Sequence, residues 1–177
     1  NPGPWIQYWK SWKTDDSFRL AAWSGRNLAK GGSTFLFQGK PVASYGVNLV
    51  TGNFNVLEDD PGINANINGV GFDEFDRYIY GFNTTHLQMA RVGSDFQVET
   101  LNVSGLPEGK SFFVGDVANH FYYLYRQNVG FYKVDLSPLD DDVTAPLTAE
   151  LITTTSKVRL TDFAFHPSNG KLYGVDN

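Results

Sequence analysis

Three polar side chains occupy similar places near the starts of predicted strands, and their types suit the binding of cations or sugars. Asp116 and Asp162 open two such strands, and Asn68 lies near the corresponding place in an earlier one. If these strands line the inside of a ring of sheets, the side chains gather near one mouth of its channel, where ligands often bind. Carboxylate and amide oxygens there can hold a cation or sugar hydroxyls. The structural alternative is that each side chain caps a turn or binds neighbouring backbone groups, as Asn and Asp commonly do.

The N-terminal segment, residues 1–32, is rich in tryptophan. Trp5, Trp9 and Trp12 are spaced four and three residues apart. Flat aromatic faces suit sugar rings, apolar ligands or a protein partner, so these three residues are a second candidate ligand site. The alternative is that they pack as a plug or clasp, because large aromatic side chains usually bury most of their area. We expect residues 1–32 to form a separate segment that packs on a β-core.

The histidines do not indicate a metal site. His86, His120 and His166 lie in or near turns of different repeats, and none is paired locally with a second ligand. Zinc sites need converging ligands, typically with close local pairs. We therefore expect no metal site.

Acidic residues are concentrated in loops. Asp59 and Asp60 form one pair, residues 140–142 form a run of three, and a hairpin tip at residues 73–76 holds three more. None of these segments has the alternating spacing of a calcium-binding loop. Solvated surface loops are therefore the expected state of all three.

No segment carries the motif of a known catalytic site. The sequence contains no Gly-x-Ser-x-Gly elbow, no phosphate-binding glycine loop and no His-Glu-x-x-His motif. It also contains no cysteine, which excludes disulfides, thiolate metal sites and cysteine nucleophiles. Paired carboxylates for glycoside hydrolysis can lie far apart in sequence. A hydrolase or lyase with a site at the channel mouth therefore stays open as the alternative to a non-enzymatic role.

The charge and the hydropathy of the sequence argue against a nucleic-acid partner and against a membrane span. The net charge of the 177 residues is −5, and no cluster of Lys and Arg stands out, so we expect no nucleic-acid partner. No apolar run is long enough to span a bilayer, so we expect no membrane span. The aromatic share of 15% favours strands, because aromatic side chains suit pleated, half-buried surfaces.

Two N-glycosylation sequons occur, at Asn83 and Asn102. Such sites are glycosylated only in secreted proteins, although about two are expected by chance in a chain this rich in Asn, Ser and Thr. The chain begins at Asn1 without methionine, which indicates a mature, processed or excised chain. We expect an extracellular glycoprotein.

The clearest pattern is an internal repeat of about 45 residues. Three segments share one outline, a strand, a polar turn and a second strand that ends in tyrosine, at Tyr80, Tyr125 and Tyr173. The Asn-Gly dipeptide at residues 169–170 is a strong hairpin signal, because both residue types tolerate positive φ. A second pair of strands lies between these hairpins, and four strands make one propeller blade. We predict an all-β fold, a β-propeller or partial propeller of four-stranded antiparallel blades over residues 33–177.

Several motifs in these repeats resemble those of a known family. They are Tyr-Gly-Val-Asn at 45–48, Gly-Leu-Pro-Glu-Gly at 105–109 and Thr-Asp-Phe-Ala-Phe-His-Pro at 161–167. From about Tyr45 onward, the chain resembles a propeller-like repeat domain of unknown function found in extracellular bacterial, fungal and animal proteins. The resemblance implies extracellular placement and a binding or surface role, and it supplies no catalytic residues.

The repeat count predicts an incomplete ring. At about 45 residues per repeat the chain holds about four blades, fewer than propellers usually contain. Because an unpaired outer edge invites association, we expect a partner chain or a second copy to complete the propeller. A compact four-bladed propeller is the alternative. The favoured function is an extracellular, non-enzymatic binding or adhesion module for carbohydrate or protein. A structural subunit of an assembly is a further alternative.

Overall fold

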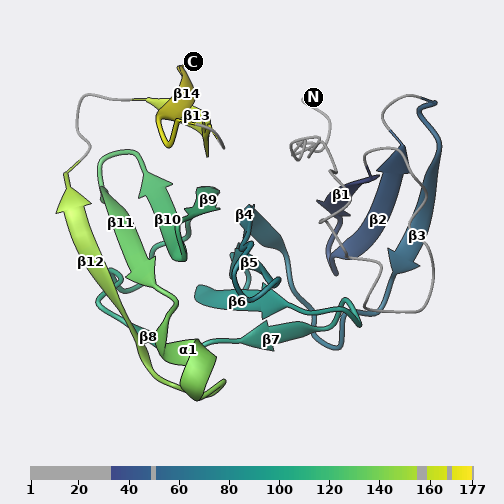
Figure 1. Ribbon diagram of the computed structural model, residues 1–177, viewed down its shortest axis with the longest axis horizontal. Helices are drawn as coiled ribbons and strands as arrows, with labels where there is room; N and C mark the ends of the chain where they lie inside the picture. Colours follow the sequence, from purple (N-terminus) through teal and green to yellow (C-terminus); the bar gives the residue numbers. More distant parts are fainter. Residues whose placement is uncertain (1–32, 49–50, 155–158, 167–168, 177) are drawn as a thin grey trace.

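The described part of the chain is almost entirely β-structure. The computed structural model describes residues 33–48, 51–154, 159–166 and 169–176 (Figure 1). These residues form fourteen strands and one short helix, α1 (Pro138–Asp141). The all-β prediction is therefore confirmed.

The strands form four sheets, which follow one another along the chain. Sheet I contains β1 (Ser33–Gln38), β2 (Ala43–Asn48) and β3 (Phe54–Glu58). Sheet II contains β4 (Ile67–Phe72), β5 (Ile79–Asn83), β6 (Gln88–Val92) and β7 (Val98–Thr100). Sheet III has the order β8-β12-β11-β10-β9, with β8 (Val103–Ser104), β9 (Val114–Ala118), β10 (Phe121–Arg126), β11 (Gly130–Asp135) and β12 (Leu147–Thr153). Sheet IV contains β13 (Leu160–Phe165) and β14 (Leu172–Asp176).

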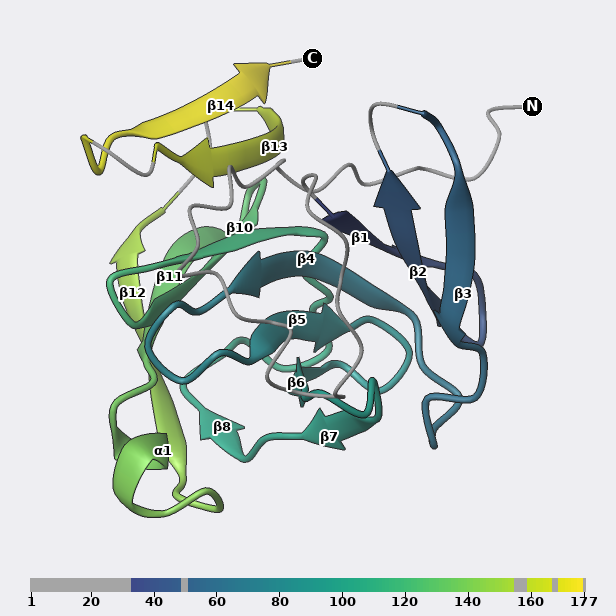
Figure 2. The ribbon, with the colours of Figure 1, turned by 45° about the vertical axis from the view of Figure 1, so that its right-hand side comes forward.

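The sheets recur with the predicted period. One strand runs along the inner edge of each of sheets II, III and IV. These strands, β4, β9 and β13, begin at Ile67, Val114 and Leu160, so they are spaced by about 45 residues. β9 lies beside β4 on one side and beside β13 on the other. The four sheets form an open arc with sheets I and IV at its ends (Figures 1 and 2), so the described residues do not close a ring.

The number of strands per sheet differs from the uniform four that we predicted. Sheet II has four strands, whereas sheets I and IV have three and two among the described residues. Sheet III has five, because the two-residue strand β8 adds in parallel to the start of β12 and pairs Val103 with Leu147. The Ser104 hydroxyl donates a hydrogen bond to the Leu147 carbonyl at 3.3 Å. The segment that follows sheet II in the chain thus adds a strand, β8, to the outer edge of sheet III. The alternation of polar and apolar residues within a strand does not reveal such a pairing between distant segments.

Consecutive sheets pack face to face, and each contact has its own hydrophobic core. The largest core lies between sheets II and III and contains Phe82 and Phe112, whose ring centroids are 5.3 Å apart in an edge-on arrangement. A second core joins Phe37 of sheet I to Val70 of sheet II. The third, between sheets III and IV, includes Phe163. Sheet III is therefore covered on both faces, which explains why β10 (FYYLYR) is apolar at nearly every position.

β4 and β9 approach so closely that glycine is needed in β4. A Cβ atom on Gly71 would lie 2.2 Å from the backbone nitrogen of Val117, and one on Gly69 would lie 3.0 Å from that of Gly115. The buried hydroxyl of Tyr122 in β10 donates a hydrogen bond to the Gly69 carbonyl at 2.6 Å. This contact brings the turns that follow β4 and β9 to the same end of the molecule.

Candidate functional site

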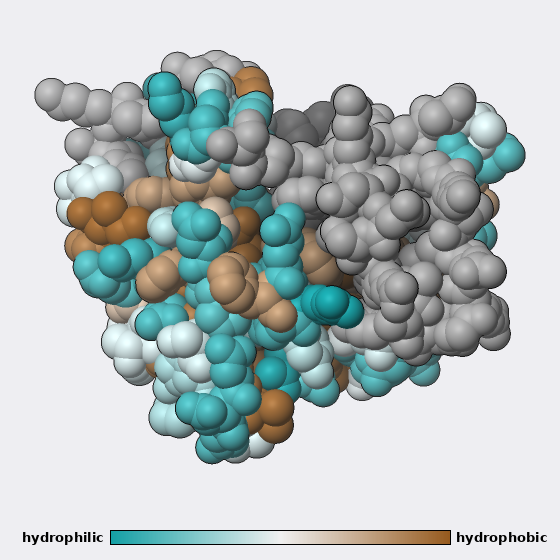
Figure 3. All heavy atoms as spheres, in the orientation of Figure 1, coloured by the Kyte–Doolittle hydropathy of each residue, from teal (hydrophilic) through white to brown (hydrophobic). Residues whose placement is uncertain are grey.

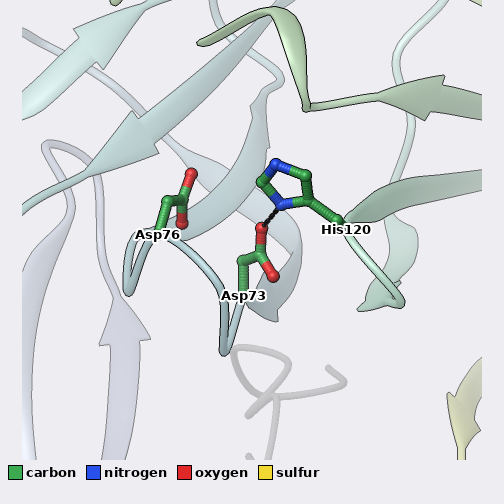
Figure 4. A group of neighbouring side chains, drawn as sticks. All are labelled: Asp73, Asp76 and His120. Atoms are coloured by element: carbon green, nitrogen blue, oxygen red, sulfur yellow. Dashed lines mark hydrogen bonds and ion pairs between the residues drawn. The ribbon is translucent and has the colours of Figure 1, made fainter. Parts of the chain in front are cut away.

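The turns after β4 and β9 bring three ionisable side chains together (Figure 4). Asp73 and Asp76 come from the turn between β4 and β5 in sheet II, and His120 comes from the turn between β9 and β10 in sheet III. One potential ligand atom of each side chain lies within 4.8 Å of those of the other two. We call these three residues the Asp–His cluster.

Backbone hydrogen bonds fix both carboxylates within their turn. Asp73 Oδ1 accepts the N–H of Phe75 at 3.1 Å, and Asp76 Oδ1 accepts the N–H of Tyr78 at 2.9 Å. Aspartate commonly binds the backbone two residues on in this way. The second oxygen of each carboxylate is left for side chains, and Asp76 Oδ2 accepts the hydroxyl of Tyr80. Both carboxylates are therefore oriented before any ligand arrives.

His120 is the second residue of a two-residue hairpin turn. Asn119 and His120 have φ angles of 52° and 64°, as the type I′ turn that joins twisted strands requires. The imidazole Nδ1 contacts Asp73 Oδ2, and its Nε2 lies 3.2 Å from Oδ2 of Asp140 in α1. The ring of Phe75 packs beside the imidazole with centroids 5.2 Å apart. His120 thus connects its own sheet to sheet II and to α1.

Two members of the cluster are buried. The side chain of Asp73 is 2% exposed and that of His120 is 11% exposed, whereas Asp140 is 54% exposed. Asp76 is half-buried. A buried charge is costly unless it is paired and hydrogen-bonded, and Asp73 meets both conditions through His120 and the turn backbone.

Burial and neighbouring charges shift several pKa values. Burial raises the pKa of the Asp76 carboxyl, although the hydrogen bond from Tyr80 opposes this. Burial, reinforced by the charge of Asp76, raises the pKa of the Tyr80 hydroxyl. Burial alone would lower the pKa of His120, but the bond to Asp73 and the charges of Asp73, Asp140 and Asp76 outweigh it and raise that pKa. The surroundings of the imidazole therefore favour a positive charge at this point.

The sequence did not reveal this cluster. We expected residues 73–76 to form a solvated tip and the histidines to lack converging ligands, yet Asp73 is buried and meets His120 across 47 positions of the chain. Of the three acidic residues in this turn, only Glu74 is exposed, as a solvated tip requires. The neighbouring Phe75 is exposed as well. A signal was present in the repeat itself, because Asp73 and His120 both lie in the turn after the first strand of their repeats. Stacked sheets place such turns side by side.

Asp116, predicted at the channel mouth, binds backbone groups in the structure, and a ligand role for it stays a prediction. Its side chain is buried in β9, Oδ1 accepts the N–H of Val117 at 3.0 Å, and Oδ2 accepts the N–H of Phe165 at 2.8 Å. The second bond links sheet III to sheet IV. This is the structural alternative that the sequence left open for Asp116.

Asp162 and Asn68 also lie outside the Asp–His cluster. Asp162 is exposed and its Oδ1 accepts the N–H of Phe163 at 2.9 Å. Asn68 is half-buried and donates from Nδ2 to Oδ1 of Asn66 at 3.1 Å. A ligand role for either residue stays a prediction. The tryptophans Trp5, Trp9 and Trp12 lie outside the described residues, as does all of residues 1–32.

The two sequons differ in accessibility. Asn83 is 0% exposed at the end of β5, and its Oδ1 accepts the N–H groups of Thr85 and His86 at 3.0 and 3.2 Å. Asn102 is exposed between β7 and β8. A glycan on Asn83 would have to displace the packing around its amide, whereas one on Asn102 would extend into solvent.

The stacked antiparallel sheets, their regular spacing and the matching turns define an all-β repeat protein. The chain belongs to the family described as a repeat of unknown function (DUF6923), which matches residues 35–177. None of the curated proteins compared with the chain matches it. Within the described ranges, no helix has the length and apolar character needed to cross a membrane.

Proposed function

We propose that this chain is a non-enzymatic, extracellular binding module built from blades of a β-propeller. The observation that carries the proposal is the stacking of the sheets. β4, β9 and β13 lie side by side, and consecutive sheets pack face to face around separate cores. Propeller blades are arranged in this way. Such a stack is a rigid scaffold whose loops and strand edges are the surfaces available for partners.

Apolar side chains on sheet IV, the last sheet among the described residues, support the proposal of a protein partner. Among the described strands, β14 pairs only with β13, and it exposes Leu172, Tyr173 and Val175 by 37%, 55% and 64%. The equivalent strands β5 and β10 are each covered by further strands of their sheets. An uncovered edge with apolar side chains is a template for strand addition. We therefore propose that a protein partner, in the first instance a second copy of this chain, adds strands to β14.

Hydrophobic side chains are also exposed on the outside of the stack (Figure 3). Leu151 and Ile152 of β12 are 47% and 43% exposed, on the part of that strand that β8 does not cover. At the far end of the arc, Phe54 and Val56 of β3 are 70% and 53% exposed. These outer strands offer further contact area to a partner that binds along the edges.

Sedimentation equilibrium over a wide concentration range tests the partner proposal. The wild-type chain should associate as its concentration rises, and Val175→Lys should weaken this association because it places a charge on the β14 edge. Val143→Lys is the matched control, since Val143 is 57% exposed in the turn after α1. A wild-type chain that stays monomeric would reject the second copy as partner. Equal weakening by both substitutions would reject the β14 edge.

The extracellular part of the proposal has its own test. We propose that the chain is secreted and that Asn102 is its glycosylated sequon. Intact-mass and peptide analysis of protein secreted from a eukaryotic host should place hexose-containing mass on Asn102, and Asn102→Gln should remove it. Secretion without a glycan, or a glycan on Asn83 in the folded protein, would contradict this assignment.

A further inference from the structure

We propose that the Asp–His cluster binds one divalent transition-metal cation, with Zn²⁺ as the representative ion, between sheets II and III. Asp73, Asp76 and His120 each offer one ligand atom, and these atoms lie within 4.8 Å of one another (Figure 4). The residues come from two turns in different sheets, so a cation held by all three would join the two sheets. The inference is independent of the proposed binding partner, because it concerns a different part of the molecule.

The donor atoms select the class of cation. One imidazole nitrogen and two carboxylate oxygens suit Zn²⁺ or Mn²⁺, which take mixed nitrogen and oxygen ligands. Ca²⁺ prefers six to eight oxygens, of which this cluster supplies too few. Three protein ligands leave at least one position for water or for an added ligand, as in open zinc sites.

The surroundings hold each donor in place. Oδ1 of Asp73 and Oδ1 of Asp76 are bound to turn N–H groups at 3.1 and 2.9 Å, and Tyr80 fixes the other oxygen of Asp76. Asp140 lies 3.2 Å from His120 Nε2. A carboxylate on the outer nitrogen of a metal-binding histidine fixes its tautomer and orients the other nitrogen toward the metal. Here that inner nitrogen is Nδ1, which points at Asp73.

Charge also favours a cation at this point. Asp73 is buried, Asp76 is half-buried, and Asp140 approaches from α1, so three carboxylates surround one imidazole. Buried carboxylates are stabilised by pairing with a cation or by coordinating a metal. The competing arrangement is a simple ion pair of protonated His120 with Asp73 and Asp140, in which no metal takes part. The test has to separate these two arrangements.

Isothermal titration of tag-free, chelator-treated protein with ZnCl₂ and MnCl₂ tests the site. We expect saturable binding of one Zn²⁺ per chain and weaker binding of CaCl₂. Asp76→Asn keeps an oxygen for the Tyr78 N–H and removes the charge, and His120→Asn removes the imidazole while keeping a residue that tolerates positive φ. Each should weaken Zn²⁺ binding by about tenfold or more, and Asp140→Asn by about tenfold through the outer nitrogen of His120.

Matched controls come from the same residue types elsewhere. Asp59→Asn and His86→Asn change exposed side chains outside the cluster and should bind Zn²⁺ as the wild type does. Circular dichroism of each variant confirms that loss of binding is not loss of fold. Because the bound cation stabilises the folded state, Zn²⁺ should raise the Tm of the wild type and the controls but not that of His120→Asn.

Nuclear magnetic resonance of the three histidines gives the decisive readout. Zn²⁺ should shift the imidazole signals that disappear in His120→Asn, in the pattern expected for coordination through Nδ1. Absence of saturable Zn²⁺ and Mn²⁺ binding to the wild type up to about 1 mM would overturn the proposal in favour of the ion pair. Binding that survives both Asp76→Asn and His120→Asn, or that shifts His86 or His166 instead, would overturn it as well.

Discussion

The two faces of sheet III are held to their neighbours in different ways. Toward sheet II, the core contains the fully buried Phe112 and Tyr122, and the Asp–His cluster lies at one end of this contact. Toward sheet IV, the buried core is smaller and includes Phe163, and the buried carboxylate of Asp116 binds the backbone of Phe165. The first contact is mainly apolar, with the buried hydrogen bond from Tyr122 to Gly69 inside it and the Asp–His cluster at its edge. We expect the polar link to carry a larger share of the stability in the second contact, because the buried core there is smaller.

The contrast follows from the size of the sheets. Sheet II presents four strands to sheet III, whereas sheet IV presents two among the described residues. Hydrophobic stabilisation is about 25 cal/mol for each Å² of apolar area removed from water, so a narrower sheet gains less from packing. Four substitutions, taken from the largest expected effect to the smallest, test this difference.

Phe112→Ala should lower the free energy of unfolding by about 3–5 kcal/mol, because it leaves a cavity in the core between sheets II and III. Urea denaturation followed by fluorescence measures the change. The neighbouring Phe113 is 50% exposed, so Phe113→Ala should cost clearly less. Equal losses for the two variants would show that Phe112 is not a core residue.

Gly71→Ala should destabilise the protein by about 3 kcal/mol, the upper end of the usual cost of overpacking. The added methyl group would meet the backbone of Val117, which cannot move without shifting β9. At Gly46 the nearest atom, 3.1 Å away, belongs to the flexible side chain of Asn55, so Gly46→Ala is the mild control. If thermal denaturation gave the two variants the same Tm, the close approach of β4 and β9 would be refuted.

Asp116→Asn should cost about 2 kcal/mol, because an amide supplies one oxygen where two backbone N–H groups need acceptors. Hydrogen exchange should become faster at the Phe165 amide in sheet IV, while the amides of sheet II keep their protection. Asp162→Asn changes an exposed residue and should stay within about 0.5 kcal/mol of the wild type. Faster exchange throughout sheet II in Asp116→Asn would contradict a local link.

Tyr122→Phe should cost about 1 kcal/mol, since it removes the buried hydrogen bond to the Gly69 carbonyl and leaves the core otherwise intact. Tyr123→Phe is the control, because the Tyr123 hydroxyl has no hydrogen bond within the described part of the chain. Chemical denaturation of both variants measures the difference. A larger loss of stability for Tyr123→Phe would show that the stabilising hydroxyl is that of Tyr123 and not that of Tyr122.

Local signals explain what the sequence predicted well. Tyr80, Tyr125 and Tyr173 lie in β5, β10 and β14, the second strands of the three hairpins that the repeat outlined. Each hairpin joins neighbouring strands through a short turn, and alternation and turn residues report such short-range structure directly. The repeat period was predictable for the same reason.

Contacts between repeats explain what the sequence missed. Asp73 and His120 are 47 residues apart, and their meeting depends on how β4 stacks against β9. The burial of Asp116 depends in the same way on the position of Phe165 in the next sheet. No local pattern encodes the sheet-to-sheet offset that sets these contacts. Alignment of the repeats, followed by placing equivalent turns side by side, is the route by which they could have been found.

The parallel pairing of β8 with β12 bears on how such repeats can be recombined. A fragment that starts just before β9, the first antiparallel strand of sheet III, would lack Val103 and Ser104 and would expose the first residues of β12. The Leu147 N–H also donates a hydrogen bond to the carbonyl of Asn102 at 2.8 Å. A cassette that is to be exchanged or duplicated therefore has to include Asn102 together with β8, because a boundary is judged by the hydrogen bonds of the backbone that it cuts.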